Sequence, residues 1–96
     1  MDMQNVREAS SRARKLVSEG AVLLDVRTPD EYRTGHLAGA RNIPVQELPR
    51  RVDEVGSRDV PVVVYCMSGM RGASAAEILR RAGFKEVLNL GPMAAW

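Results

Sequence analysis

Residues 61–74 read PVVVYCMSGMRGAS, an apolar run that gives way to a glycine-rich turn and then to a helical pattern. The run at residues 61–66 is mostly β-branched and starts at a proline, which is typical of a strand. It carries no charged side chain on either face, so we predict a central strand buried in a parallel sheet. After the turn, apolar residues recur at helical spacing and predict a core-facing helix that begins near Ala73 and ends at Gly83.

Strand-like and helix-like segments alternate along the rest of the chain. Helical spacing predicts a helix over residues 5–19 and another helical stretch over residues 48–55, with a start or irregularity at Pro49. Three further segments are short enough and apolar enough for strands: AVLLDV at residues 21–26, ARNIP at residues 40–44 and EVLNL at residues 86–90.

A short helix is expected directly after the first of these strands. Thr28 can cap its free amides, and Pro29 suits its first position. Glu31 can reach back to the amide of Thr28, which completes a capping box, and Gly35 ends the helix. Strands that alternate with helices predict an α/β fold, and the length of 96 residues predicts one domain over residues 1–96.

The composition, 45% hydrophobic and 27% charged, is that of an ordinary soluble globular protein. The net charge is +2, but basic and acidic residues are interleaved, so we expect no nucleic-acid partner. The basic residues Arg7, Arg12, Arg14 and Lys15 fit a solvated helix face. The chain starts without an apolar signal segment and has no run of about 20 apolar residues, so we expect a cytoplasmic protein without a membrane span.

Cys66 is the only cysteine, so it cannot form an internal disulfide. It ends the predicted central strand, and open α/β sheets bind ligands at the carboxyl ends of their strands. Glycines at positions 69 and 72 let the following backbone curl, so that its amides and the start of the next helix would cradle an anion and stabilise a thiolate. Cys66 is therefore a candidate nucleophile, although a strand-end cysteine can also be only a small buried hydrophobe.

The candidate binding residues are those of the loop itself: Met67, Ser68, Gly69, Met70, Arg71 and Gly72. Arg71 has forked donors that suit an oxyanion, so we expect it to orient an anionic substrate. One histidine and one cysteine cannot make a four-ligand zinc site, and we expect neither metal nor organic cofactor. His36 lies between two glycines, where it is expected to hold a turn by hydrogen bonds rather than to act as a base.

Three blocks of the sequence resemble the single-domain rhodanese family. They are LLDVRTPDEYRTGHLAGARNIP at residues 23–44, VVVYCMSGMRGASAA at residues 62–76 and GFKEVLNLGPMAAW at residues 83–96. The resemblance implies a three-layer α/β fold whose central, mostly parallel, five-stranded sheet is flanked by helices. It also implies a sulfurtransferase in which Cys66 takes a sulfane sulfur from a donor such as thiosulfate or a persulfide and passes it to cyanide or a thiol.

The expected partners are therefore small sulfur donors and acceptors, or a protein sulfur carrier or thioredoxin-like reductant, with the chain a monomer or weak dimer. Two alternatives remain. One is a non-catalytic binding or redox-sensing module, and the other is a cysteine phosphatase or arsenate reductase of the related fold. Four residues separate Cys66 from Arg71, whereas the phosphatases use five, so the shorter loop favours a single sulfur atom.

Two departures from the family pattern concern the donor. Met67 and Gly72 stand where many members have a polar residue and a Ser or Thr, and Met67 with Met70 would make a soft apolar rim that favours a persulfide donor over thiosulfate. Asp25 and Arg27 end the first strand on the same sheet edge as Cys66. They could brace the loop, or Arg27 could simply pair with Glu31.

Overall fold

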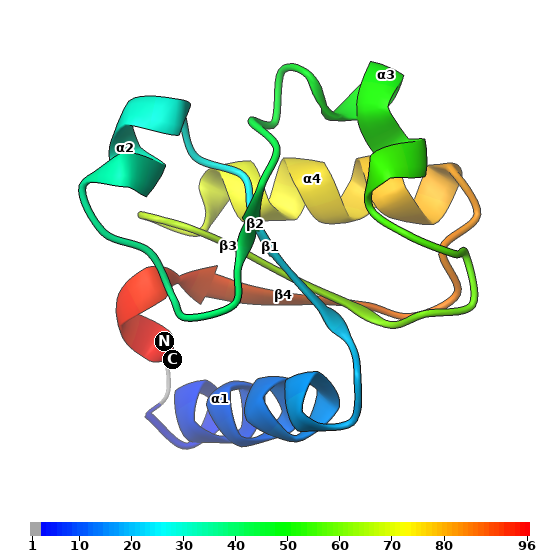
Figure 1. Cartoon of the computed structure of the whole chain (residues 1–96). Helices are drawn as coiled ribbons and strands as arrows, with labels where there is room; N and C mark the ends of the chain where they lie inside the picture. Colours follow the sequence, from blue (N-terminus) through cyan, green and yellow to red (C-terminus); the bar gives the residue numbers. More distant parts are fainter. Residues whose placement is uncertain (1–2) are drawn as a thin grey trace.

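The computed structural model describes residues 3–96 and contains one parallel sheet of four strands in the order β2-β1-β3-β4. Figure 1 shows the sheet as a twisted layer between helices. The strands are β1 (Val22–Asp25), β2 (Arg41–Asn42), β3 (Val62–Cys66) and β4 (Val87–Pro92). All three pairings are parallel, and β3 lies between β1 and β4, so the prediction of a central strand there is confirmed.

The expectation of five strands is wrong for the part of the chain that the structure describes. Each of the four segments with strand-like composition forms a strand. The chain between β2 and β3 forms a short helix, α3 (Leu48–Arg51), and a 3-10 turn, η1 (Val52–Glu54), which confirms the helical stretch expected over residues 48–55. Its apolar residues recur at helical rather than alternating spacing, so one face of these turns packs on the core while the backbone bonds within itself.

Helices cover both faces of the sheet. Figure 1 shows α1 (Met3–Ser18) on one face and α4 (Met70–Arg81), with α3, on the other. The short helix α2 (Pro29–Arg33) follows β1, and a 3-10 turn, η2 (Met93–Ala95), follows β4. The three-layer α/β expectation is therefore confirmed.

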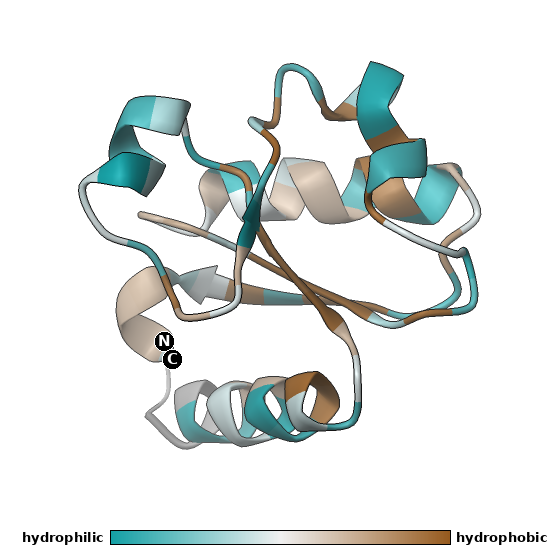
Figure 2. Ribbon diagram, in the orientation of Figure 1, coloured by the Kyte–Doolittle hydropathy of each residue, from teal (hydrophilic) through white to brown (hydrophobic). Residues whose placement is uncertain are grey.

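The β3 strand explains why both faces need a cover. Val62, Val64 and Cys66 belong to the core on the α4 side, whereas Val63 and Tyr65 belong to the core on the α1 side, and all five are completely buried. The apolar strands run through the middle of the molecule in Figure 2, and hydrophilic residues lie on the outer helices. Alternate side chains of a strand point to opposite faces, so a continuous apolar run demands a layer on each side.

The start of α2 is built as the sequence predicts. The hydroxyl of Thr28 accepts the Glu31 amide at 3.2 Å, and the Glu31 carboxylate accepts the Thr28 amide at 3.0 Å. This capping box satisfies amides that a helix start otherwise leaves free. It also fixes the position of the Glu31 side chain, whose carboxylate accepts hydrogen bonds from Arg71 as well.

A buried ion pair closes the end of β1. Asp25 and Arg27 are 0% and 1% exposed, and the Arg27 guanidinium donates to both Asp25 oxygens, the shortest contact being 2.7 Å. The hydrogen bond to Asp25 raises the pKa of Arg27. The same guanidinium donates to the Gly35 carbonyl at 2.6 Å, so the pair ties β1 to the turn after α2.

The alternative pairing of Arg27 with Glu31 is therefore wrong. Among the hydrogen bonds of residues 3–96, those of the Asp25 and Arg27 side chains go to each other and to the Gly35 turn, and none goes to residues 67–72. The pair stabilises the fold beside the loop rather than bracing the loop itself.

Within the described chain no helix is both long enough and apolar enough to cross a membrane.

Removing one partner of this pair should be costly. In Asp25→Ala the guanidinium of Arg27 stays buried without its counter-charge, so we expect a loss of about 3–5 kcal/mol in the free energy of unfolding. Urea unfolding followed by circular dichroism measures this loss. Asp59→Ala is the matched control, because Asp59 pairs with Lys85 in an exposed position, and it should change stability little. Equal losses in both variants would contradict the importance of the buried pair.

Candidate active site

Cys66 is the last residue of β3 and is completely buried. It packs with the core on the α4 side, and its neighbour across the sheet is Pro92 in β4. Within residues 3–96 it is a free thiol. The prediction that the cysteine sits at the carboxyl end of a central strand is therefore confirmed.

The loop after Cys66 turns its backbone amides toward the sulfur. The N–H of Gly69 donates to Cys66 Sγ at 2.7 Å, and the N–H of Gly72 lies 3.4 Å from the same atom. Gly69 has a φ of +95°, a left-handed conformation that favours glycine, and this reversal lets the chain enter the helix at once. Two amides that converge on one sulfur make a site for a thiolate or another sulfur anion.

The helix α4 starts at Met70, three residues earlier than the expected start near Ala73. The left-handed Gly69 precedes it directly, so the loop is shorter than the sequence suggested. As a result Met70, Arg71 and Gly72 lie in the first turn of the helix. The positive end of the helix dipole is thereby placed beside Cys66.

The six predicted loop residues divide into three kinds. Gly69 and Gly72 bring their amides to the sulfur. Met67, Ser68 and Met70 are exposed, and the two methionines are 51% and 79% exposed, so they form an apolar rim around the loop. Arg71 is half-buried and makes a contact of its own.

That contact is a salt bridge to Glu31. The Arg71 guanidinium donates to the two Glu31 oxygens at 2.6 and 3.1 Å. These hydrogen bonds lower the pKa of Glu31 to about 2, and they raise the pKa of Arg71. Glu31 is therefore ionised near neutral pH and compensates the charge of Arg71. The expected role of Arg71 in orienting an anion stays a prediction, and such an anion must compete with Glu31.

Sequence reasoning missed two neighbours of the loop. The sequence indicates a capping box for Glu31, or a pairing with Arg27, but nothing in the spacing of 40 residues between Glu31 and Arg71 signals their contact. Asn89 of β4 reaches the loop as well, with its Nδ2 at 3.5 Å from the Gly69 carbonyl. An asparagine within a predicted strand was the available signal, because strands are depleted in asparagine.

His36 holds its turn, as the sequence predicts. Its Nδ1 lies 2.8 Å from the Tyr32 carbonyl, and its ring stacks on the Tyr32 ring with centroids 3.7 Å apart. The hydroxyl of Tyr32 in turn donates to the Ala40 carbonyl at 2.7 Å. The imidazole serves the turn between α2 and β2.

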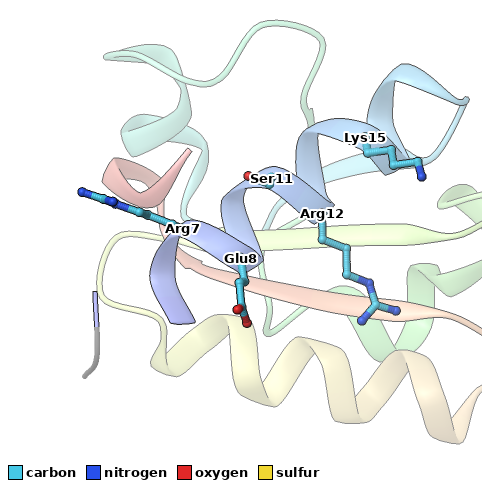
Figure 3. Close-up of a pocket in the computed structure, with 5 residues that line it drawn as sticks. All are labelled: Arg7, Glu8, Ser11, Arg12 and Lys15. Atoms are coloured by element: carbon cyan, nitrogen blue, oxygen red, sulfur yellow. The ribbon is translucent and has the colours of Figure 1, made fainter. Parts of the chain in front are cut away.

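Hollows on the described surface include one beside the active loop and one along α1. One of about 420 Å³ lies beside the active loop, between residues 68–70, residues 89–92 and the small side chains of Ala9, Ala73 and Ala95. The other, of about 500 Å³, lies on the outer side of α1. Figure 3 shows that the residues of this second hollow all come from one helix and spread apart rather than converge: Arg7, Glu8, Ser11, Arg12 and Lys15. Arg7, Arg12 and Lys15 of the predicted basic face lie here, whereas Arg14, which is also exposed, donates to the Trp96 carbonyl at 2.6 and 2.9 Å.

The geometry therefore supplies a single nucleophile with an amide cradle. Within residues 3–96 no group of three or more His, Cys, Asp or Glu side chains is placed to hold a metal ion. A thiolate in such a cradle can attack an electrophilic atom and hold the resulting anion.

Comparisons with known proteins agree with this arrangement. The profile of the Rhodanese-like domain matches residues 9–96. A protein from Allochromatium vinosum named "Sulfurtransferase" is 36% identical, over 98% of this chain and 89% of its own. The uncharacterized protein YqhL of Bacillus subtilis is 44% identical over 79% of this chain, which spans 60% of that relative's length.

A solved structure shares the fold. A rhodanese from Escherichia coli, determined with anions, superposes with a TM-score of 0.75 and 35% identity, over 80% of this chain and 92% of its own. The residues that match the family profile, 9–96, include β3, Cys66 and the loop after it. The chain therefore belongs to the Rhodanese-like domain family.

Proposed function

We propose that this protein is a rhodanese-type sulfurtransferase that moves a sulfane sulfur through a persulfide on Cys66. Family membership and the sulfurtransferase relative support the enzyme class. The observation that carries the residue assignment is the pair of amides, from Gly69 and Gly72, on the sulfur of the only cysteine. A small hydrophobe buried for packing would not need these donors.

The proposed reaction has two displacements at sulfur. The Cys66 thiolate attacks the outer sulfur of thiosulfate, a new S–S bond forms, and sulfite leaves with the electron pair of the bond that breaks. The persulfide is itself an anion, and the amides of the loop hold its charge. A nucleophile such as cyanide then attacks the outer sulfur, which releases thiocyanate and restores the thiolate. The reaction should therefore follow ping-pong kinetics, because the sulfur acceptor reacts only after the desulfurated donor, here sulfite, has left.

The surroundings of the loop bear on the class of donor. Cys66 is buried, and the large exposed side chains of the loop that follows it are those of Met67 and Met70. Arg71 carries the positive charge nearest the cradle in sequence, and Glu31 neutralises it. A dianion such as thiosulfate thus meets an apolar rim and a compensated charge. This arrangement favours a persulfide donor, from a small thiol or a protein, over thiosulfate.

The two alternative functions have less support. A non-catalytic redox-sensing module would use the same buried thiol without passing sulfur on. A phosphatase or arsenate reductase would hold an oxyanion in the loop, but only four residues lie between Cys66 and Arg71, and the Gly69 amide already lies 2.7 Å from the sulfur. The short spacing favours a single sulfur atom over a tetrahedral oxyanion.

The persulfide itself is the first test. After incubation with a sulfane donor, the intact mass of the protein should rise by one sulfur atom, and cyanide should remove that mass and yield thiocyanate. Cys66→Ser should show no gain, because the chain has no second cysteine. A protein that gains no sulfur from thiosulfate or from a small-thiol persulfide, yet hydrolyses a phosphate ester, would overturn the proposal.

The salt bridge allows a test of donor selection. Gln at position 31 keeps the capping box but removes the charge that compensates Arg71. In Glu31→Gln we expect the KM for thiosulfate to fall about threefold to tenfold, which is about 1 kcal/mol in binding. The KM for a neutral organic trisulfide should stay unchanged.

Glu77→Gln is the matched control for this test. Glu77 pairs with Arg81 at 2.8 Å on the exposed side of α4, the helix that carries Arg71. Glu77→Gln therefore changes the net charge by the same amount as Glu31→Gln, but away from the loop. An equal fall of KM in both variants would point to long-range attraction rather than to Arg71.

The salt bridge between Glu31 and Arg71 also predicts how the stability of the protein depends on pH. Because the pKa of Glu31 falls from 4.5 to about 2 on folding, its contribution is present in full above pH 4.5 and is lost as the pH falls toward 2. The difference in unfolding free energy between the native protein and Glu31→Gln should thus be constant from pH 7 to about pH 5 and shrink below that. Urea unfolding at several pH values measures it, and a difference that grows toward acid would contradict the assignment.

A further inference from the structure

The β4 strand carries an irregularity beside the active loop. Val64 pairs with Asn89 and Tyr65 with Gly91, so Leu90 is an extra residue that bulges out of the register. Gly91 has a φ of +92°, and its amide donates to Asn89 Oδ1 at 2.9 Å. An asparagine side chain that accepts the amide two residues on stabilises a turn. The bulge therefore has its own local support and holds the Asn89 side chain in one place.

The Asn89 side chain contacts both residues whose amides face the sulfur. Its Nδ2 donates to the Gly69 carbonyl at 3.5 Å, and the Gly69 N–H lies 2.7 Å from Cys66 Sγ. A Cβ atom at position 72 would lie only 2.4 Å from Asn89 Oδ1, while the Gly72 N–H faces the same sulfur. Asn89 thus lies against both residues of the cradle.

The glycine at position 72 follows from this contact. Gly72 lies in the first turn of α4 and is absent from the glycines with positive φ, so its backbone conformation is open to any residue. Alanine would favour a helix by about 1 kcal/mol over glycine. Space is the remaining reason for glycine, and Asn89 occupies that space. Gly69 differs, because a Cβ there would make only an ordinary contact with Gly91 Cα at 3.5 Å, and its positive φ is the reason for glycine.

We propose that Asn89 is a positioning residue for sulfur transfer: it sets the distance of the Gly69 and Gly72 amides from the Cys66 sulfur. The inference rests on the proposed function of Cys66 and assigns part of the site to a strand outside the loop. A backbone donor acts on a developing anion only while it is held at hydrogen-bond distance. Asn89 holds one residue by a hydrogen bond and confines the other by contact.

Asn89→Ser and Gly72→Ala separate this role from ordinary stability. A serine hydroxyl can still accept the Gly91 amide, but it is too short to reach the Gly69 carbonyl. Gly72→Ala forces the Asn89 amide away, whereas in Gly72→Ala/Asn89→Ser the new methyl group has room. Asn42→Ser is the control, because Asn42 Nδ2 also donates to backbone carbonyls, those of Asp25 and Arg27, but away from the loop.

Two readouts are measured on each variant. The first is steady-state transfer from thiosulfate to cyanide, resolved into kcat and KM. The second is the pH profile of the thiolate absorbance of Cys66, taken against Cys66→Ser, with thermal unfolding as a check that each variant is folded. We expect Asn89→Ser to lower kcat about tenfold with little change in KM, and to move the appearance of the thiolate to higher pH. Gly72→Ala should do the same.

The double variant should be no slower than Asn89→Ser alone, and Gly72→Ala should destabilise the native protein but stabilise the Asn89→Ser background. Asn42→Ser should leave the thiolate profile unchanged even where it lowers the melting temperature. A wild-type profile and kcat in Asn89→Ser, or strictly additive losses in the double variant, would overturn the proposal. If the native protein forms no persulfide, the proposed function fails, while the absorbance comparison still decides the role of Asn89.

Discussion

The 2.7 Å contact between the Gly69 amide and the Cys66 sulfur constrains every element around it. The contact requires β3 to end at Cys66, the backbone to reverse at a left-handed Gly69, and α4 to start at Met70. Each requirement has a local cause, because three valines and a tyrosine favour a strand up to the cysteine, and a glycine is placed where the chain must turn. The helix start then adds its dipole on the same side as the sulfur.

The charges of the structure are arranged so that the cradle holds little free charge of its own. Arg71 lies next to the loop, but Glu31 binds it at two points. Arg27 is buried against Asp25 and the Gly35 carbonyl, away from the thiol. The charges that face the Cys66 sulfur are thus the partial charges of fixed amides, which cannot move away or take up a counter-ion. The exposed side chains of the loop include those of Met67 and Met70, which carry no charge.

Much of this could be predicted from local patterns. The four strands, the capping box at Thr28, the cysteine at a strand end and the turn at His36 all follow from neighbouring residues, and the structure confirms them. Local patterns failed where the decision is not local. The helix start at Met70 depends on a left-handed glycine, which a sequence permits but does not require. The expected fifth strand came from the resemblance and not from a local pattern, whereas the helical spacing of residues 48–55 correctly predicted the turns of α3 and η1.

The sequence by itself determined which residue can react and what kind of backbone surrounds it, because strand propensity, glycine and capping act over a few residues. Only the tertiary structure decided which side chains contact the loop. Glu31 reaches Arg71 across 40 residues, and Asn89 reaches Gly69 across 20. The first contact joins two helices, α2 and α4, and the second joins β4 to the residue before α4. No periodicity along the chain encodes them, because their geometry exists only after the layers have packed.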